Sequence, residues 1–173
     1  MPKKHKSETD SELGSRLTAH EVLLAEAPGV EAMEKLFQRL DGILFCIKDR
    51  EGCYLSANAA FLRRARVENP SDLIGRTSKE IFPPLLAAGY EQQDAVVTSR
   101  GEETRDRLEM ITNSDGGVGW YLSDKIPIRN RDGNIIGIAS MSRDLRSSAD
   151  NDPRYAKVAS VIEYMRAHYD EPL

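Results

Sequence analysis

Residues 125–145 read KIPIRNRDGNIIGIASMSRDL. This stretch contains the end of one β-type segment, 118–128, then a turn at 130–134, then a second β-type segment, 135–145. Asp132-Gly133 supplies the positive φ that a tight antiparallel connection requires. Upstream, the run 103–112 precedes a similar turn at 113–117, which contains Asp115-Gly116. The pattern predicts three consecutive antiparallel strands.

A hairpin and several helical segments precede these strands. Residues 43–58, ILFCIKDREGCYLSAN, read as two strands joined by a turn at 49–52. Asn58 is placed to cap a helix over 59–67, because its side chain can accept a hydrogen bond from the first helical turn. Short helical turns follow within 71–84, and a helix over 85–101 ends at Gly101. Two more helices, 15–26 and 30–40, come before the hairpin.

Composition describes a globular protein of one ordinary domain with appendages: 173 residues, 40% hydrophobic and 30% charged. No apolar run approaches the roughly 18 residues that cross a bilayer. Residues 1–14 lack the apolar segment of a secretory signal, so we expect a disordered N-terminus, no membrane partner and a cytoplasmic protein. The net charge of −4 provides no positive field that would attract nucleic acid.

The order of these segments resembles a PAS domain, and three motifs carry the resemblance. They are IKDREGCYLSANAAF (47–61), with Asn58 and Phe61 at the Asn and Phe positions of the family, LIGRTSKEIFP (73–83), and the stretch 125–145. The resemblance implies an α+β fold over 41–146, in which a five-stranded antiparallel sheet carries short helices on one face. Residues 15–40 are then flanking helices.

The C-terminal segment VIEYMRAHYDEPL (161–173) is similar to the first helix of the DNA-binding region of AraC-type transcription regulators. Val158, Val161, Ile162 and Met165 lie on one face of that helix. We therefore expect a linker at 147–153 and the start of a truncated helix-turn-helix region at 154–173, with DNA bound only through the missing region. The alternative is a helix that packs back on the sheet.

The strand at 118–128 has two faces, and the apolar count alone would turn Trp120 and Leu122 toward the core. The PAS resemblance instead implies that Tyr121, Ser123 and Lys125 face the helices, and we follow it. On the same basis the candidate ligand-binding residues are Cys46, Lys48, Phe61, Leu85, Tyr90, Tyr121, Ser123, Lys125, Ser140 and Ser142.

A buried Lys48 or Lys125 needs an anionic partner or a depressed pKa. If the amines point inward, the hypothesis is that the ligand carries a carboxylate or a similar anion. The alternative is that both lysine side chains reach water at their ends.

Several cofactors and reactions are not expected. Residues 40–145 contain no histidine that could ligate a haem, and IGRTSKEIF (74–82) lacks the cysteine motif of flavin photoreceptors. Two cysteines and three distant histidines make no metal site. Without a core histidine or a phosphate-binding loop, we expect no catalytic residues and no enzyme.

The N-terminal helices and the outer sheet face suggest a homodimer, with candidate interface residues Leu24, Met33, Phe37, Leu40, Trp120 and Leu122. Within one subunit the same residues could instead bury each other. The predicted function is a sensory module of a bacterial AraC-type regulator that binds an unknown small cytoplasmic molecule. The alternative is a dimerisation or protein-interaction scaffold with no ligand.

Overall fold

A computed structural model describes residues 19–112, 117–146 and 153–168. Five strands form one antiparallel sheet in the order β2-β1-β5-β4-β3. The strands are β1 (Ile43–Asp49), β2 (Tyr54–Ala57), β3 (Thr104–Thr112), β4 (Val118–Arg129) and β5 (Ile135–Asp144). The predicted α+β class and the five-stranded sheet are confirmed. The expectations for residues 1–14 and for all but Pro153 of the linker at 147–153 lie outside the described residues.

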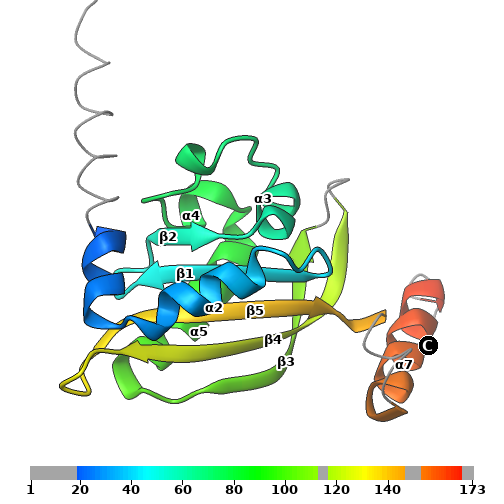
Figure 1. Cartoon of the computed structure of the whole chain (residues 1–173). Helices are drawn as coiled ribbons and strands as arrows, with labels where there is room; N and C mark the ends of the chain where they lie inside the picture. Colours follow the sequence, from blue (N-terminus) through cyan, green and yellow to red (C-terminus); the bar gives the residue numbers. More distant parts are fainter. Residues whose placement is uncertain (1–18, 113–116, 147–152, 169–173) are drawn as a thin grey trace, which may run out of the picture.

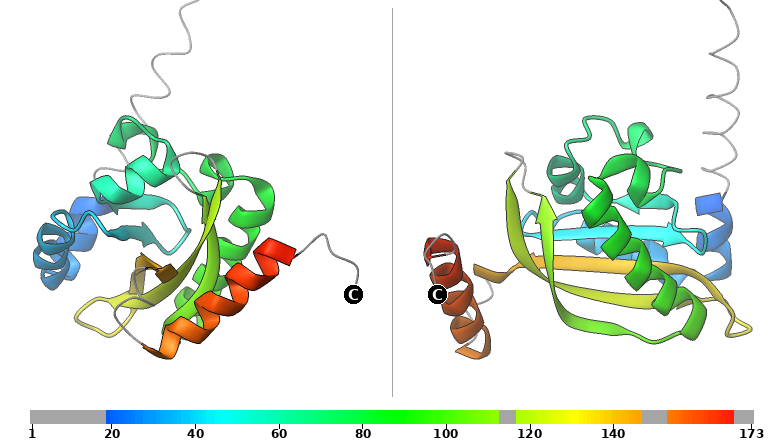
Figure 2. Two further views of the ribbon diagram at one scale, coloured as in Figure 1. Left: turned by 90° about the vertical axis from the view of Figure 1, so that its right-hand side faces the viewer. Right: turned by 180° about the vertical axis from the view of Figure 1, so that it is seen from behind.

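Helices cover both faces of this sheet (Figures 1 and 2). A helix over 19–26 and α2 (Gly29–Phe37) lie on one face, and α3, α4 and α5 lie on the other. The remaining bounds are α3 (Ala59–Ala65), η1 (Pro70–Asp72), α4 (Ser78–Ile81), α5 (Pro84–Arg100) and α7 (Pro153–His168). Gly101 ends α5 as predicted, with a φ of 69° that suits glycine.

The alternation of side chains along β1 explains why two cores form. Phe45 and Ile47 point to the α2 side, where they pack with Leu23 and Val30. Leu44 and Cys46 point to the other side, under α3 and α5. Because successive strand residues face opposite ways, a run of apolar residues fills both layers.

Asn58 joins three elements at one buried point. Its Oδ1 accepts hydrogen bonds from the backbone N–H groups of Phe61 and Phe45, and it caps α3 as predicted. Its Nδ2 donates to the carbonyls of Phe37, Leu40 and Ile43. A fully buried amide with these partners fixes the end of α2 relative to β1 and α3.

The candidate dimer residues divide between the core and the surface. Leu24, Met33 and Phe37 pack against the core on the α2 side of their own chain, which is the alternative noted above. Leu122 is 3% exposed and leaves no surface for a partner, so its assignment to a dimer interface is wrong. Leu40 is exposed and Trp120 is half-buried.

The C-terminal segment is helical from Pro153 to His168, and α7 lies beyond one end of the sheet (Figure 1). Polar contacts hold it: Arg146 pairs with Glu163 at 3.0 Å, and the Arg143 guanidinium lies over the Tyr155 ring. Val158, Val161 and Met165 from the predicted apolar face are exposed. Most of that face therefore does not pack on the sheet.

Candidate functional site

A small cavity lies between the sheet and helices α3 and α5. Its volume is about 50 Å³, and its wall combines aromatic rings with charged side chains. The lining residues are Leu44, Cys46, Lys48, Tyr54, Phe61, Arg64, Ala65, Phe82, Tyr90, Asp94, Glu109, Ile111, Lys125, Ser140 and Ser142.

Most of the residues predicted for a ligand site meet at this cavity. Those that line it are Cys46, Lys48, Phe61, Tyr90, Lys125, Ser140 and Ser142. Tyr121 and Ser123 are buried on the same face of the sheet, and the Ser123 hydroxyl lies 2.7 Å from that of Ser142. The prediction that Tyr121, Ser123 and Lys125 face the helices is confirmed.

Leu85 is a correction, because its side chain is 81% exposed and forms no part of the cavity wall. Helix α5 turns Ala87, Asp94 and Val97 toward the protein interior. A residue two positions before Ala87 lies about 200° around the helix from it. The start of α5 therefore presents Leu85 to solvent.

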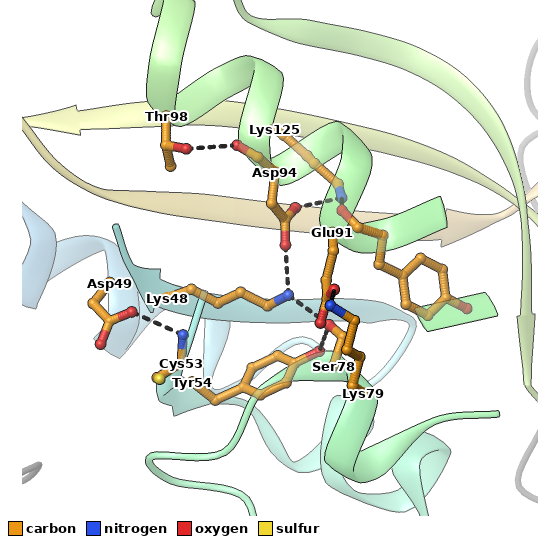
Figure 3. A network of polar contacts seen from close by, with 11 residues as sticks. Lys48, Asp49, Cys53, Tyr54, Ser78, Lys79, Glu91, Asp94, Thr98 and Lys125 are labelled. Carbon is orange, nitrogen blue, oxygen red and sulfur yellow. Dashed lines mark hydrogen bonds and ion pairs between the residues drawn. The ribbon is translucent and has the colours of Figure 1, made fainter. Parts of the chain in front are cut away.

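The centre of the site is a carboxylate that binds two lysines (Figure 3). Asp94, from α5, accepts hydrogen bonds from Lys48 Nζ of β1 at 2.5 Å and from Lys125 Nζ of β4 at 2.6 Å. Lys48 also donates to Ser78 Oγ at 2.8 Å. Its ammonium lies 4.4 Å from the centre of the Tyr54 ring. The network thus connects α5 and α4 to two strands.

Burial makes this network electrostatically strong. Lys48, Asp94 and Lys125 are each at most 5% exposed, so neither lysine reaches water. The anion that they require is a side chain of this chain. Burial alone raises the pKa of the Asp94 carboxyl, but the charges and hydrogen bonds of both lysines outweigh it and hold that pKa below its usual value. Two ammonium groups share this one carboxylate.

The thiol and the two tyrosine hydroxyls of the wall are held neutral. Burial raises the pKa of the Cys46 thiol to about 11. Burial also raises the pKa values of the Tyr54 and Tyr90 hydroxyls. Cys46 therefore acts as a small apolar wall residue, as predicted, and the two tyrosines remain protonated.

Sequence reasoning missed Asp94, Glu109, Tyr54 and Arg64. The position of Asp94 carried a usable signal, because it lies at helical spacing from Tyr90 and Val97, on the buried stripe of α5. An acidic residue in such a stripe predicts a buried partner of opposite charge. Tyr54 follows Cys53 in the strand that the hairpin prediction already contained, but nothing marked its ring as facing the cavity.

The sequence pattern of the PAS fold matches residues 37–150. Among curated proteins, none matches the chain. Among solved structures, the PAS domain of Bordetella pertussis BvgS is 22% identical over 71% of this chain and 96% of its own, with a TM-score of 0.57. At this identity the likeness shows the fold alone.

VqmA of Vibrio cholerae is more similar in sequence. Three VqmA structures are 29–30% identical over 66–67% of this chain, with TM-scores of 0.57. One is VqmA bound to DPO, one is a VqmA complex with a ligand and DNA, and one is a VqmA dimer without target DNA, described with LuxR-type receptors. This chain covers only 50–56% of the VqmA chains. The match over residues 37–150 shows that the chain belongs to the PAS fold family.

Proposed function

We propose that this chain is the sensory module of a DNA-binding transcription regulator, and that it binds a small cytoplasmic molecule in the cavity between the sheet and α5. The observation that carries the proposal is the charged, buried wall of that cavity. A scaffold has no need to bury two lysines beside an open space. The structures of VqmA with DPO, and with a ligand and DNA, support the same role.

The finer proposal is that the regulator is of the AraC type. The resemblance of 154–173 to the first helix of that DNA-binding region supports it, as does the helix α7 with an exposed apolar face. The likeness to VqmA, which is described with LuxR-type receptors, favours a different DNA-binding region. In a regulator of either type, ligand binding would change the spacing between two DNA-binding regions.

The site offers a physical route from ligand to output. Asp94 holds α5 to β1 and β4 at once, so a ligand that binds either lysine weakens that attachment. A ligand shifts the equilibrium between two arrangements of α5 only by its difference in affinity for them. The proposed signal is therefore a change in the position of α5 relative to the sheet.

The second candidate function is a dimerisation scaffold with no ligand, and the cavity volume favours it. About 50 Å³ has room for a few water molecules, each of which needs about 10–15 Å³ of such space, but it is far below the roughly 300–1,000 Å³ of a usual ligand pocket. A ligand with several heavy atoms must displace wall side chains to enter.

A ligand screen separates the two candidates. The full chain is heated with DPO and with a metabolite library, and unfolding is followed by the change in melting temperature. A ligand at 100 times its Kd adds about 2.7 kcal/mol of stability. Under the sensory proposal, Lys125→Met loses the shift, while Lys79→Met, at a lysine that is 71% exposed, keeps it. A library without any stabilising compound would favour the scaffold.

The homodimer remains part of the proposal. On the outer face of the sheet, a hollow of about 370 Å³ is bordered by Met33, Phe37 and Ile126. Leu108, Met110 and Ile126 are 38–40% exposed. Sedimentation of an Ile126→Lys variant tests this face: a monomer supports the interface, and an unchanged dimer excludes it.

A further inference from the structure

The helix over 19–26 lies on the α2 side of the sheet and buries little of its own surface (Figure 1). Among residues 19–26, Leu23 is the one that is buried, at 3% exposure, and it packs with Phe45 and Ile47 of β1. Gly137 of β5 makes room for it, since a Cβ there would lie 2.9 Å from Leu23 Cδ1. Segments with few buried apolar contacts open locally at a small cost in free energy. The attachment of this helix therefore depends on its further contacts.

A side-chain pair between two helices supplies such a contact. His20 Nε2 lies 2.8 Å from Oε1 of Glu34, which is 14 residues further along the chain on α2. Glu34 is 8% exposed and belongs to the buried face of α2, together with Val30. A buried carboxylate is costly without a partner of opposite charge. Protonated His20 provides that charge, so the pair attaches helix 19–26 to α2.

The charged groups around His20 come from three elements. Glu34 faces it from α2, and Glu21 lies beside it on the same helix. Asp49 ends β1 on this face of the sheet, by alternation with Ile47, and accepts a hydrogen bond from the backbone N–H of its own turn. All three groups are acidic. Negative charges near an imidazole favour its protonated form.

The direction of the pH dependence follows from these neighbours. The hydrogen bond to Glu34 is the largest influence on the pKa of His20, and together with the charges of Glu34 and Glu21 it outweighs burial, so that this pKa is raised above its usual value of 6.5. The stability that such a pair provides is fully present below the pKa of the unfolded protein. It is lost as the pH rises through the pKa of His20 in the folded protein. Helix 19–26 should therefore be attached more firmly at about pH 6 than at about pH 8.

We propose that the His20–Glu34 pair is a proton-controlled clasp, which holds helix 19–26 on the sheet while His20 is protonated and releases it when the proton leaves. Release uncovers apolar side chains of β1 on this face, while alternate residues of the same strand line the cavity on the other face. Proton concentration is then an input separate from the proposed ligand, and the clasp does not depend on ligand sensing.

Hydrogen exchange of the ¹⁵N-labelled full chain without ligand measures the release. The reporter is the Ala27 N–H, which donates to the Leu23 carbonyl at 2.9 Å at the end of this helix. Its exchange rate is corrected for the intrinsic rate at each pH and expressed as a protection factor. From about pH 6 to about pH 8 this factor should fall by at least about threefold, because one proton changes an equilibrium by up to about tenfold per pH unit.

The variants assign the effect to the pair. His20→Gln and Glu34→Gln should each leave nearly equal protection factors at the two pH values, since each removes one charge of the clasp. Glu31→Gln is the matched control on α2, because it breaks an exposed ion pair with Lys35 and should keep the wild-type fall. A wild-type factor that does not change with pH, or a fall that persists in both clasp variants, would overturn the inference.

Two further readings distinguish a local release from general unfolding. The ring shifts of His20 should titrate with a midpoint above 6.5 in the wild type, and Glu34→Gln should lower that midpoint. At about pH 8 the Ala27 amide should be protected less than the most protected amides of β5, by about tenfold or more. Equal protection of the two would mean that the helix opens only with the whole domain, and the clasp would then be refuted. The ligand screen is independent of both readings, so failure here leaves the proposed function in place.

Discussion

The substitution Asp94→Asn tests the central network most directly. Asparagine keeps the size of the side chain but removes its charge, and it offers one carbonyl oxygen in place of two carboxylate oxygens. Lys48 and Lys125 would then remain buried, at 3% and 5% exposure, without an anion. The variant thus changes electrostatics while it leaves the packing of α5 almost unaltered.

The magnitude follows from the burial of the pairs. Removal of one partner from a buried ion pair costs about 3–5 kcal/mol, because a charge stays buried without compensation. Asp94 binds two lysines at 2.5 and 2.6 Å, so we expect the upper part of this range, about 4–5 kcal/mol. For a chain of this length, this loss lowers the melting temperature by roughly 8–20 °C.

Urea unfolding gives the measurement, and Trp120 is the single tryptophan that reports it by fluorescence. The midpoint should fall while the slope stays constant, because the exposed surface does not change. The apolar combination Lys48→Met, Asp94→Leu and Lys125→Met should recover most of the lost stability. A loss below about 1 kcal/mol for Asp94→Asn would refute the reasoning, since this is the range of an exposed ion pair.

The pH dependence supplies a second signature of the same residue. The pKa of the Asp94 carboxyl is lower in the folded than in the unfolded protein, because two lysines stabilise its charged form after burial is counted. The stability that the ionised Asp94 carboxylate provides is therefore fully present above the pKa of this carboxyl in the unfolded protein, about 3.9. This stability is lost as the pH falls through the pKa of the Asp94 carboxyl in the folded protein. The stability gap between wild type and Asp94→Asn should accordingly narrow in acid.

Three further predictions concern the frame around the site. Asn58→Ala removes the five hydrogen bonds of a buried side chain and should cost more than the roughly 1 kcal/mol of an ordinary helix cap, as measured by urea unfolding. Gly137→Ala should destabilise by about 1–3 kcal/mol, because its Cβ would lie 2.6 Å from a carbonyl oxygen of β1. Its control Gly89→Ala, with open space in α5, should stabilise by about 0.5–1 kcal/mol. A hydrogen bond to Glu34 raises the pKa of His20, so His20→Gln should lose more stability at about pH 6 than at about pH 8, by melting temperature.

The fold could be predicted because its signals are local. Asp-Gly in the turn at 130–134 and Asn58 before α3 act within a few residues, and each forces one backbone geometry. Helix ends were less accurate: α2 ends at Phe37 instead of Leu40, where the chain closes in a turn with the Leu40 N–H on the Phe37 carbonyl, and the Asn58 amide holds the carbonyls of Phe37 and Leu40. That constraint is tertiary, and no local pattern reports it.

The site could be predicted only in part, because two neighbouring strands reverse the usual hydrophobic alternation. On β4 the polar Ser123 and Lys125 face the interior, and the resemblance to a family was needed to choose that face. On β3 Glu109 is buried while Leu108 and Met110 are partly exposed, and the apolar pattern alone would give the opposite orientation.

These reversals carry functional information of their own. The local preferences and hydrophobic pattern of a sequence usually match its fold. Positions where they do not match concentrate at functional sites, where function demands a less stable arrangement. Here both reversals lie on adjacent paired strands, and both turn charged groups toward one cavity. The same reversals turn apolar side chains of β3 outward, to the face proposed for the dimer. One pair of strands therefore joins the proposed ligand site to the proposed interface, with only the thickness of a sheet between them.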